Sequence, residues 1–116
     1  NTVYDFRAEK ILQKEGGYDQ SFLVNNYTHH LQAAAEATGN ETGLHLTVFT
    51  TEPVVHLYTG GGIPEMVING EKKFGHFSGF CFETQKEPNA INVPHFSNTV
   101  LRPGETYREK TIYRVL

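Results

Sequence analysis

Two short extended runs separated by a proline do most to constrain how this chain can fold. Residues 44–50 alternate and are rich in β-branched side chains, and residues 54–59 form a second run of the same kind. Pro53 stands between the runs and favours a bend, because proline cannot donate a hydrogen bond to a sheet. These runs predict an all-β, antiparallel chain.

The segment before the first run has a different local preference. Residues 32–37 have helix propensity, and the turn-rich residues 38–43 follow them. We predict that residues 31–37 nevertheless form a strand that pairs back onto residues 44–50, because tertiary pairing can override local propensity.

Shorter signals assign the rest of the chain. Pro103-Gly104 is a strong turn signal near the carboxyl end. The remaining expectations are strands at 3–7, 22–24 and 79–82, a helical turn within 8–15, a mobile glycine-bearing loop at 60–74, and a closing hairpin of 99–101 with 106–115.

Composition excludes several classes of protein. The chain has 116 residues, enough for one domain with a modest core, and its formal charge of −3 comes without the basic stripe that nucleic-acid binding needs. No apolar run approaches the roughly 20 residues that span a bilayer, and no signal peptide is visible, so no membrane association is expected. The single cysteine, Cys81, excludes an internal disulfide and fits a reducing compartment, which predicts a cytoplasmic location.

Glu83 is the first candidate for chemistry. It directly follows the apolar run 79–82, and the polar residues that begin with Thr84 are expected to be exposed to solvent. A carboxylate where a buried strand opens onto a loop is partly desolvated, which raises its pKa and makes it a better proton acceptor. An ordinary strand-end glutamate, in a salt bridge or in solvent, fits the same spacing.

Asp19 and His56 are candidates for contacts with a ligand. Asp19 follows two glycines and a tyrosine, where an aspartate either bonds nearby amides of the turn or accepts hydrogen bonds from a ligand. His56 shares one face of the run 54–59 with Tyr58, either as a half-buried strand histidine or as part of a polar, aromatic floor. His29 and His30 point to opposite sides of an extended chain and lack a matching ligand cluster, so no metal site is expected.

Several blocks of the sequence resemble, in order, the aldose 1-epimerase (galactose mutarotase) family. The most distinctive is Ser-Gly-Phe-Cys-Phe-Glu-Thr-Gln at residues 78–85. The other blocks lie at residues 5–7, 16–19, 50–60, 88–92 and 101–107. The resemblance implies that residues 1–116 are the C-terminal portion of a galactose mutarotase-like β-sandwich.

The resemblance also implies an activity, the interconversion of the α and β anomers of hexoses such as galactose and glucose. A base takes the proton of the anomeric hydroxyl and an acid protonates the ring oxygen, so that the ring opens and closes on the other face. Glu83 matches the base of the family. Asp19 matches a residue that holds sugar hydroxyls, and His56 stands where the family has glutamine or histidine. Proton transfer alone suffices, so no cofactor is expected.

The acid of the family is a histidine that precedes the portion resembled here. None of the remaining histidines lies in a block that matches this acid; they are His29, His30, His45, His76 and His95. We therefore expect this chain to need the N-terminal portion of the same sandwich for catalysis. The competing hypothesis is a carbohydrate-binding β-sandwich module without catalysis, which would keep Asp19 and His56 but would not need Glu83 as a base.

Overall fold

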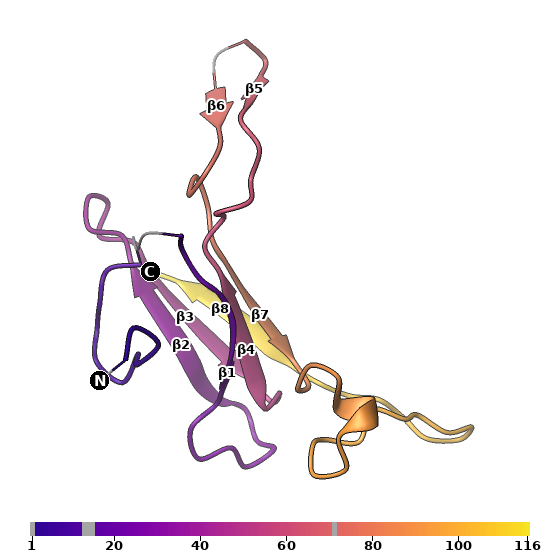
Figure 1. Cartoon of the computed structure of the whole chain (residues 1–116). Coiled ribbons are helices and arrows are strands. Elements are labelled where there is room, and N and C mark those ends of the chain that lie inside the picture. Colours follow the sequence, from indigo (N-terminus) through magenta and orange to yellow (C-terminus); the bar gives the residue numbers. More distant parts are fainter. Residues whose placement is uncertain (1, 13–15, 71) are drawn as a thin grey trace. The chain divides into compact units, whose positions relative to one another are not determined.

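The computed structural model of the chain describes residues 2–12, 16–70 and 72–116 (Figure 1). The chain divides into two compact units, a smaller one of Asn1–Asp19 with Tyr58–Cys81 and a larger one of Gln20–Leu57 with Phe82–Leu116. The regular structure of the described residues is strand, apart from the short 3₁₀ helix η1, Ala90–Asn92. The predicted all-β, antiparallel class is confirmed.

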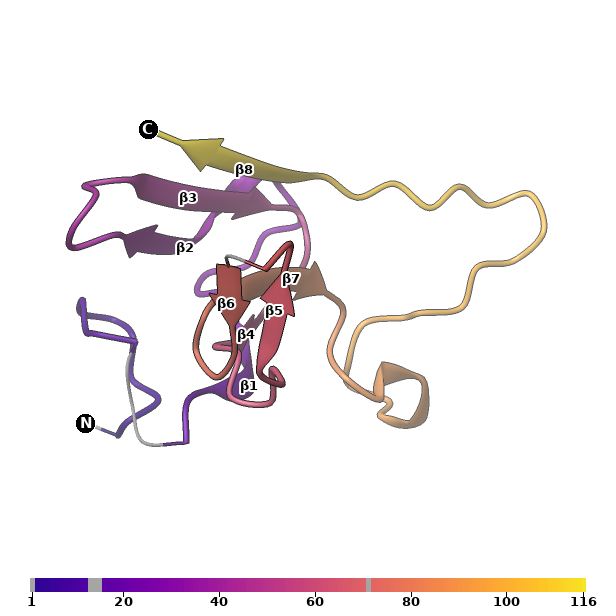
Figure 2. The ribbon, with the colours of Figure 1, turned by 90° about the horizontal axis from the view of Figure 1, so that it is seen from above.

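The first sheet of the larger unit has the strand order β2-β3-β8, which Figure 2 shows side by side. β2 (Gln32–Thr38) pairs with β3 (His45–Thr50), and β3 pairs with β8 (Thr111–Val115), both in the antiparallel sense. The predicted strand at residues 31–37 is therefore confirmed, and tertiary pairing has overridden the helix propensity of its alanines. The register shifts once, between Ala33 and Ala35.

The second sheet has the order β1-β4-β7, and its strands lie in the larger unit over most of their length. The strands are β1 (Asp19–Leu23), β4 (Val54–Tyr58) and β7 (Cys81–Gln85). The backbone N–H of Val24 donates to the carbonyl of Pro53 at 2.8 Å, so the end of β1 meets the start of β4. β1 and β4 are therefore antiparallel neighbours.

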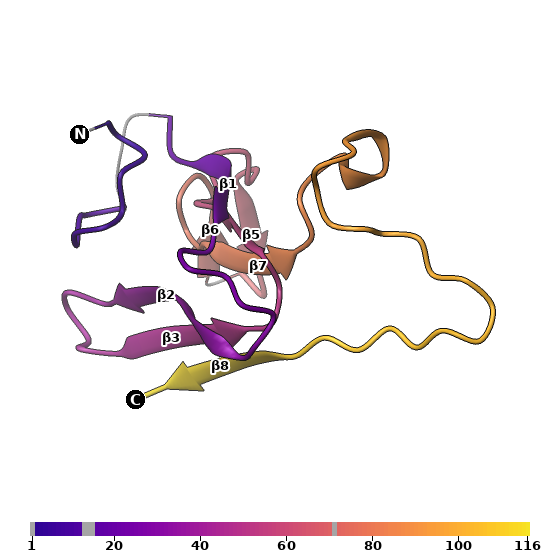
Figure 3. The ribbon, with the colours of Figure 1, turned by 90° about the horizontal axis from the view of Figure 1, so that it is seen from below.

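The core of the larger unit is small and centred on β3 and β4. Val48 and Thr50 of β3 are fully buried, and Val54, Val55 and Leu57 of β4 are at most 4% exposed. Figure 3 shows the sheet of β2, β3 and β8 from the opposite side to Figure 2. Because these buried side chains come from strands joined by three residues, the bend at Pro53 fixes where the two sheets begin.

The connection from β7 to β8 is long and largely irregular (Figures 2 and 3). It contains η1 and a turn in which the N–H of Glu105 donates to the carbonyl of Arg102 at 3.0 Å. The predicted turn is present, but the predicted hairpin of 99–101 with 106–115 is wrong. β8 pairs with β3 instead, because the edge of β3 offers a ladder of five residue pairs.

The smaller unit is organised around Tyr18, which is 5% exposed. Its ring makes edge contacts with Tyr4 and Phe6, and its hydroxyl donates to the carbonyl of Val3 at 3.0 Å. Gly17 has a φ of +68°, and a Cβ there would lie 2.5 Å from the Thr59 hydroxyl. Only glycine fits this approach.

Two expectations for the smaller unit are wrong. Residues 3–7, expected as a strand, form a turn in which the N–H of Asp5 donates to the carbonyl of Thr2. Residues 8–12 are not helical, and residues 13–15 lie outside the described part.

The expected mobile loop at 60–74 instead contains a hairpin of β5 (Met66–Ile68) with β6 (Lys72–Phe74). Asn69 and Gly70, which follow β5, both adopt positive φ, a conformation that asparagine and glycine accept more readily than other residues. Within the described residues, no helix has the length and apolar character needed to cross a membrane.

Candidate functional site

Glu83 stands in the middle of β7 and points away from the β8 sheet. Its neighbour Thr84 places Oγ1 2.5 Å from the Oγ1 of Thr111, so Thr84 faces β8. Successive side chains of a strand alternate, so Glu83 faces the other side. Glu83 is exposed, and the expected burial is wrong for this chain. The run before it gives little cover, since Phe80 is 44% exposed and Cys81 and Phe82 are half-buried.

His56 lies on β4 between two buried neighbours. Val55 and Leu57 are 4% and 3% exposed, whereas His56 is half-buried on the opposite face of the strand. Its Nδ1 atom lies 2.9 Å from the hydroxyl oxygen of Ser21 on β1. The sequence analysis did not single out Ser21, although it stands two positions after Asp19 and alternation places both on one face of β1.

His56 and Glu83 lie on the neighbouring strands β4 and β7. An ion pair joins Glu52, two residues before β4, to Lys86, the residue after β7. The start of β4 therefore lies beside the end of β7, and the two strands are antiparallel. Counted from this ion pair, His56 is four residues along β4 and Glu83 is three residues along β7. The two residues therefore lie at similar positions along adjacent strands.

Asp19 is the first residue of β1 and belongs to the smaller unit. It is exposed, and it directly follows the buried Tyr18. The Tyr18 N–H donates to the Thr59 hydroxyl at 2.7 Å, and the Thr59 N–H donates to the Tyr18 carbonyl at 2.9 Å. These two bonds fix the backbone immediately before Asp19.

A cluster of charged residues in the larger unit was not anticipated from the sequence. The Nζ atom of Lys86 lies 2.6 Å from Glu109 Oε1 and 2.8 Å from Glu52 Oε2. The Tyr107 hydroxyl donates to Glu52 Oε1 at 2.7 Å, and the Thr51 hydroxyl donates to Glu109 Oε2 at 2.6 Å. We call Glu52, Lys86, Tyr107 and Glu109 the Lys86 cluster.

The Lys86 cluster perturbs the titration of its members. Burial opposes the charge on Lys86, but its hydrogen bonds to Glu109 and Glu52 outweigh that cost and raise the pKa of Lys86. Burial likewise opposes the charge on Glu109, yet hydrogen bonds from Lys86 and Thr51 lower its pKa. The hydrogen bond to Glu52 raises the pKa of Tyr107. The charged forms of Lys86 and Glu109 are therefore the stable ones at neutral pH.

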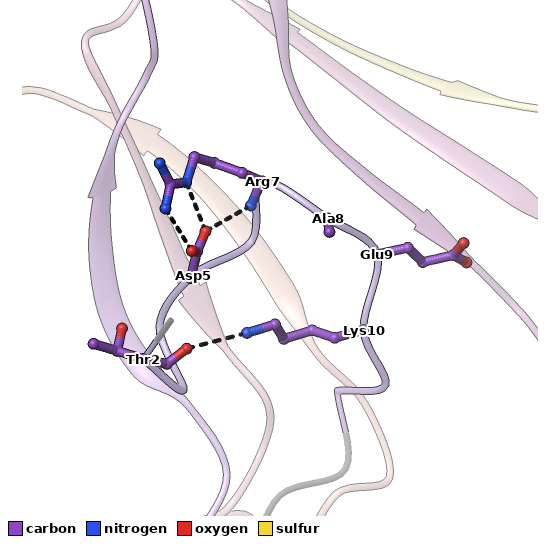
Figure 4. A pocket seen from close by; sticks show the side chains of 6 residues that line it. All are labelled: Thr2, Asp5, Arg7, Ala8, Glu9 and Lys10. Carbon is purple, nitrogen blue, oxygen red and sulfur yellow. Dashed lines mark hydrogen bonds and ion pairs between the residues drawn. The ribbon is translucent and has the colours of Figure 1, made fainter.

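A pocket in the smaller unit contains several local interactions (Figure 4). Its lining residues are Thr2, Asp5, Arg7, Ala8, Glu9 and Lys10. Arg7 binds both carboxylate oxygens of Asp5, from Nε at 2.8 Å and from Nη2 at 2.6 Å. The hydrogen bonds from Arg7 hold the pKa of Asp5 well below its usual range. Lys10 donates to the backbone carbonyl of Thr2. None of the predicted site residues lines this pocket, and Asp5 and Arg7 pair with each other.

Comparison with known proteins identifies the family. Residues 1–114 match the family described as aldose 1-epimerase. This chain belongs to the aldose 1-epimerase family. It is 34% identical over 123 residues to galactose mutarotase of Bos taurus, an alignment that covers 97% of this chain and 35% of that protein. It is 30% identical over 130 residues to aldose 1-epimerase of Escherichia coli (strain K12), covering 99% of this chain and 37% of that protein.

These comparisons confirm the predicted family. The chain spans a little over a third of the length of the relatives it matches. Asp19, His56 and Glu83 all fall inside the matched range of this aldose 1-epimerase family member. Within the described residues, no group of three or more His, Cys, Asp or Glu side chains is arranged to hold a metal ion.

Proposed function

We propose that this chain is part of an aldose 1-epimerase that interconverts the α and β anomers of hexoses such as galactose and glucose. The observation that carries the proposal is the family match over residues 1–114, together with an exposed carboxylate, Glu83, on the strand next to His56. In this proposal Glu83 is the general base, and Asp19 and His56 bind the sugar.

The chemistry requires an acceptor and a donor of protons. Glu83 removes the proton of the anomeric hydroxyl while an acid protonates the ring oxygen, and the C1–O5 bond breaks to give the open-chain aldehyde. Rotation about C1–C2 presents the other face of the aldehyde, and the reverse transfers close the ring. An accessible carboxylate can approach the anomeric hydroxyl within hydrogen-bond reach, which is the geometric condition for a base.

The acid is proposed to come from a portion of the protein outside residues 1–116, N-terminal to them in the same sandwich. The relatives are almost three times as long as the matched segment. β8 also leaves apolar side chains exposed at an edge of its sheet, including Ile112 at 41%, Tyr113 at 54% and Val115 at 60%. Apolar area of this kind favours cover by a further part of the sandwich.

The proposal is tested by polarimetry of freshly dissolved α-D-glucose and α-D-galactose with the full-length protein. Rates well above the buffer rate are expected, with a smaller kcat/KM in Asp19→Asn and in His56→Ala. Glu41→Gln is the matched control, because Glu41 is an exposed loop carboxylate. Wild-type protein that does not accelerate mutarotation of either sugar would overturn the proposed activity.

The second candidate is a carbohydrate-binding module without catalysis, which the exposure of Glu83 permits. It predicts sugar binding that depends on Asp19 and His56, with no acceleration of mutarotation. Isothermal titration with galactose, run beside the polarimetry, separates the two functions. Binding with turnover supports the epimerase, and binding without turnover supports the module.

A further inference from the structure

The Lys86 cluster gathers the ends of four strands of the larger unit at one point. Glu52 lies between the end of β3 and the start of β4, Lys86 follows β7, and Glu109 precedes β8 by two residues. A backbone bond from the Thr51 N–H to the Lys110 carbonyl, at 3.0 Å, adds to the side-chain contacts. One ammonium group therefore joins both sheets of the unit.

Burial makes the contacts of the Lys86 cluster costly to break. The side chain of Glu52 is 4% exposed, and those of Lys86 and Glu109 are 21% and 22% exposed. A carboxylate that has lost its water needs a charged or hydrogen-bonding partner. Lys86 is the cation that the described contacts give to both Glu52 and Glu109. Its removal would leave two carboxylates near each other and poorly solvated, which is the costly way to break a buried ion pair.

We propose that Lys86 is a positioning residue that holds β7 against β4 and so sets the location of Glu83 relative to His56. The inference rests on the proposed function, in which Glu83 is the base. Glu83 is three residues from Lys86, or about 10 Å along an extended strand, and His56 is four residues from Glu52, or about 13 Å. Among the described side-chain contacts, the ion pair between Glu52 and Lys86 is therefore the one nearest to Glu83 and His56 that joins the end of β7 to the start of β4.

A small movement at this end matters for proton transfer. If the end of β7 next to Lys86 moves away from β4, the Glu83 carboxylate shifts with it, since Glu83 is only two residues from the end of that short strand. Misplacement of a reacting group by about 1 Å costs on the order of 100-fold in rate. Sugar contacts made from β1 are less affected, because β1 joins β4 on its other side and is held there by the Val24–Pro53 bond.

The test compares three variants of the full-length protein. Lys86→Met removes the ammonium while keeping most of the side-chain length, and Lys86→Arg restores a cation. Lys110→Met is the matched control, since Lys110 is exposed and lies beside the cluster. Mutarotation kcat and KM are measured well below the melting temperature of each variant, with the folded fraction checked by circular dichroism.

A folded Lys86→Met protein is expected to lose about tenfold or more in kcat, with KM for the sugar changed by about twofold at most. Lys86→Arg should recover most of kcat, and Lys110→Met should behave as wild type. A folded Lys86→Met protein with wild-type kcat would overturn the proposal and leave the cluster a purely structural one. If Lys86→Met does not fold, Glu109→Gln takes its place, with a drop of several-fold expected in kcat and a wild-type kcat overturning the proposal.

Hydrogen exchange gives a readout that does not depend on activity. The amides of β7 should exchange faster in Lys86→Met than in Lys110→Met, and equal exchange would overturn the inference. The activity of Glu83→Gln distinguishes a failure of the proposed function from a failure of the positioning role. If Glu83→Gln retains turnover, the proposed base is wrong. If it loses turnover while Lys86→Met keeps it, the positioning role alone is wrong.

Discussion

The hydroxyl of Thr59 accepts a 2.7 Å hydrogen bond from the backbone N–H of Tyr18, a residue 41 positions earlier in the chain. Both residues are 5% exposed. The bond joins the turn of residues 16–19 to the residue after β4. It also explains why position 17 is glycine, because a Cβ there would collide with the Thr59 hydroxyl. Asp19 follows this turn directly, so the bond links the fold of the smaller unit to a proposed sugar contact.

Thr59→Val is expected to destabilise the protein, because it keeps the shape of the side chain and leaves the buried Tyr18 N–H without its partner. The free energy of unfolding should fall by about 1–3 kcal/mol in urea titrations. Thr59→Ser keeps the hydroxyl and should lose less. Equal losses in the two variants would show that packing, not the hydrogen bond, fixes the turn.

Val48→Ala tests the core of the larger unit. Val48 is fully buried on β3, between β2 and β8, so the change removes two methyl groups from a packed interior. We expect a loss of about 2 kcal/mol in the free energy of unfolding. Val67→Ala is the control, because Val67 is 59% exposed, and its effect should stay within about 0.5 kcal/mol. A Val48→Ala loss no larger than that of the control would contradict the assigned core.

The Lys86 cluster makes stability depend on pH in two windows. The pKa of Glu109 is lowered from 4.5 in the folded state, so its contribution is present above pH 4.5 and is lost as the pH falls through the folded pKa. The pKa of Lys86 is raised from 10.5, so its contribution is present below pH 10.5 and is lost as the pH rises through the folded pKa. The cluster should stabilise the fold most between these limits.

The acid side of this dependence is measured by urea unfolding at a series of pH values from neutral to below 4.5. Wild-type stability should fall more steeply on acidification than that of Glu109→Gln, whose amide does not titrate. Parallel curves for the two proteins would show that Glu109 contributes nothing to the acid sensitivity.

Ser21→Ala tests the hydrogen bond that holds His56. The pair lies at the surface, so the free energy of unfolding should change by less than about 1 kcal/mol. If His56 binds the sugar, kcat/KM should fall several-fold, because the imidazole loses the group that orients it. Ser21→Thr keeps the hydroxyl and should retain activity. Loss of activity in both variants would point to crowding at this position, not to the hydrogen bond.

The strand runs on either side of Pro53 could be predicted because their alternation is local. The pairing of residues 31–37 was predicted against local propensity, with the support of the family resemblance. The failure of the closing hairpin could not be predicted, because nothing local to residues 106–115 reveals that β3 competes for them. Asn69-Gly70 is itself a turn signal, but the strands that it joins have only three residues each, too few to show an alternation in the sequence.

For the candidate site, the exposure of Glu83 could not be predicted from the sequence. The sequence places Glu83 at the end of a strand, whereas it lies in the middle of β7, and its exposure depends on how much of Phe80 and Cys81 the fold covers. Ser21 follows from alternation with Asp19, yet its bond to His56 depends on the register of β1 with β4. The Lys86 cluster joins residues up to 57 positions apart, between Glu52 and Glu109, and such contacts have no local pattern.

The central claim is that Glu83 removes the anomeric proton, and Glu83→Gln in the full-length protein tests it most directly. Mutarotation of α-D-galactose is followed by polarimetry beside wild type and Glu41→Gln, with galactose binding measured on the same samples. The account predicts that Glu83→Gln loses turnover by about 100-fold or more while its sugar affinity stays within a few-fold of wild type. A Glu83→Gln protein that accelerates mutarotation as wild type does would contradict the account.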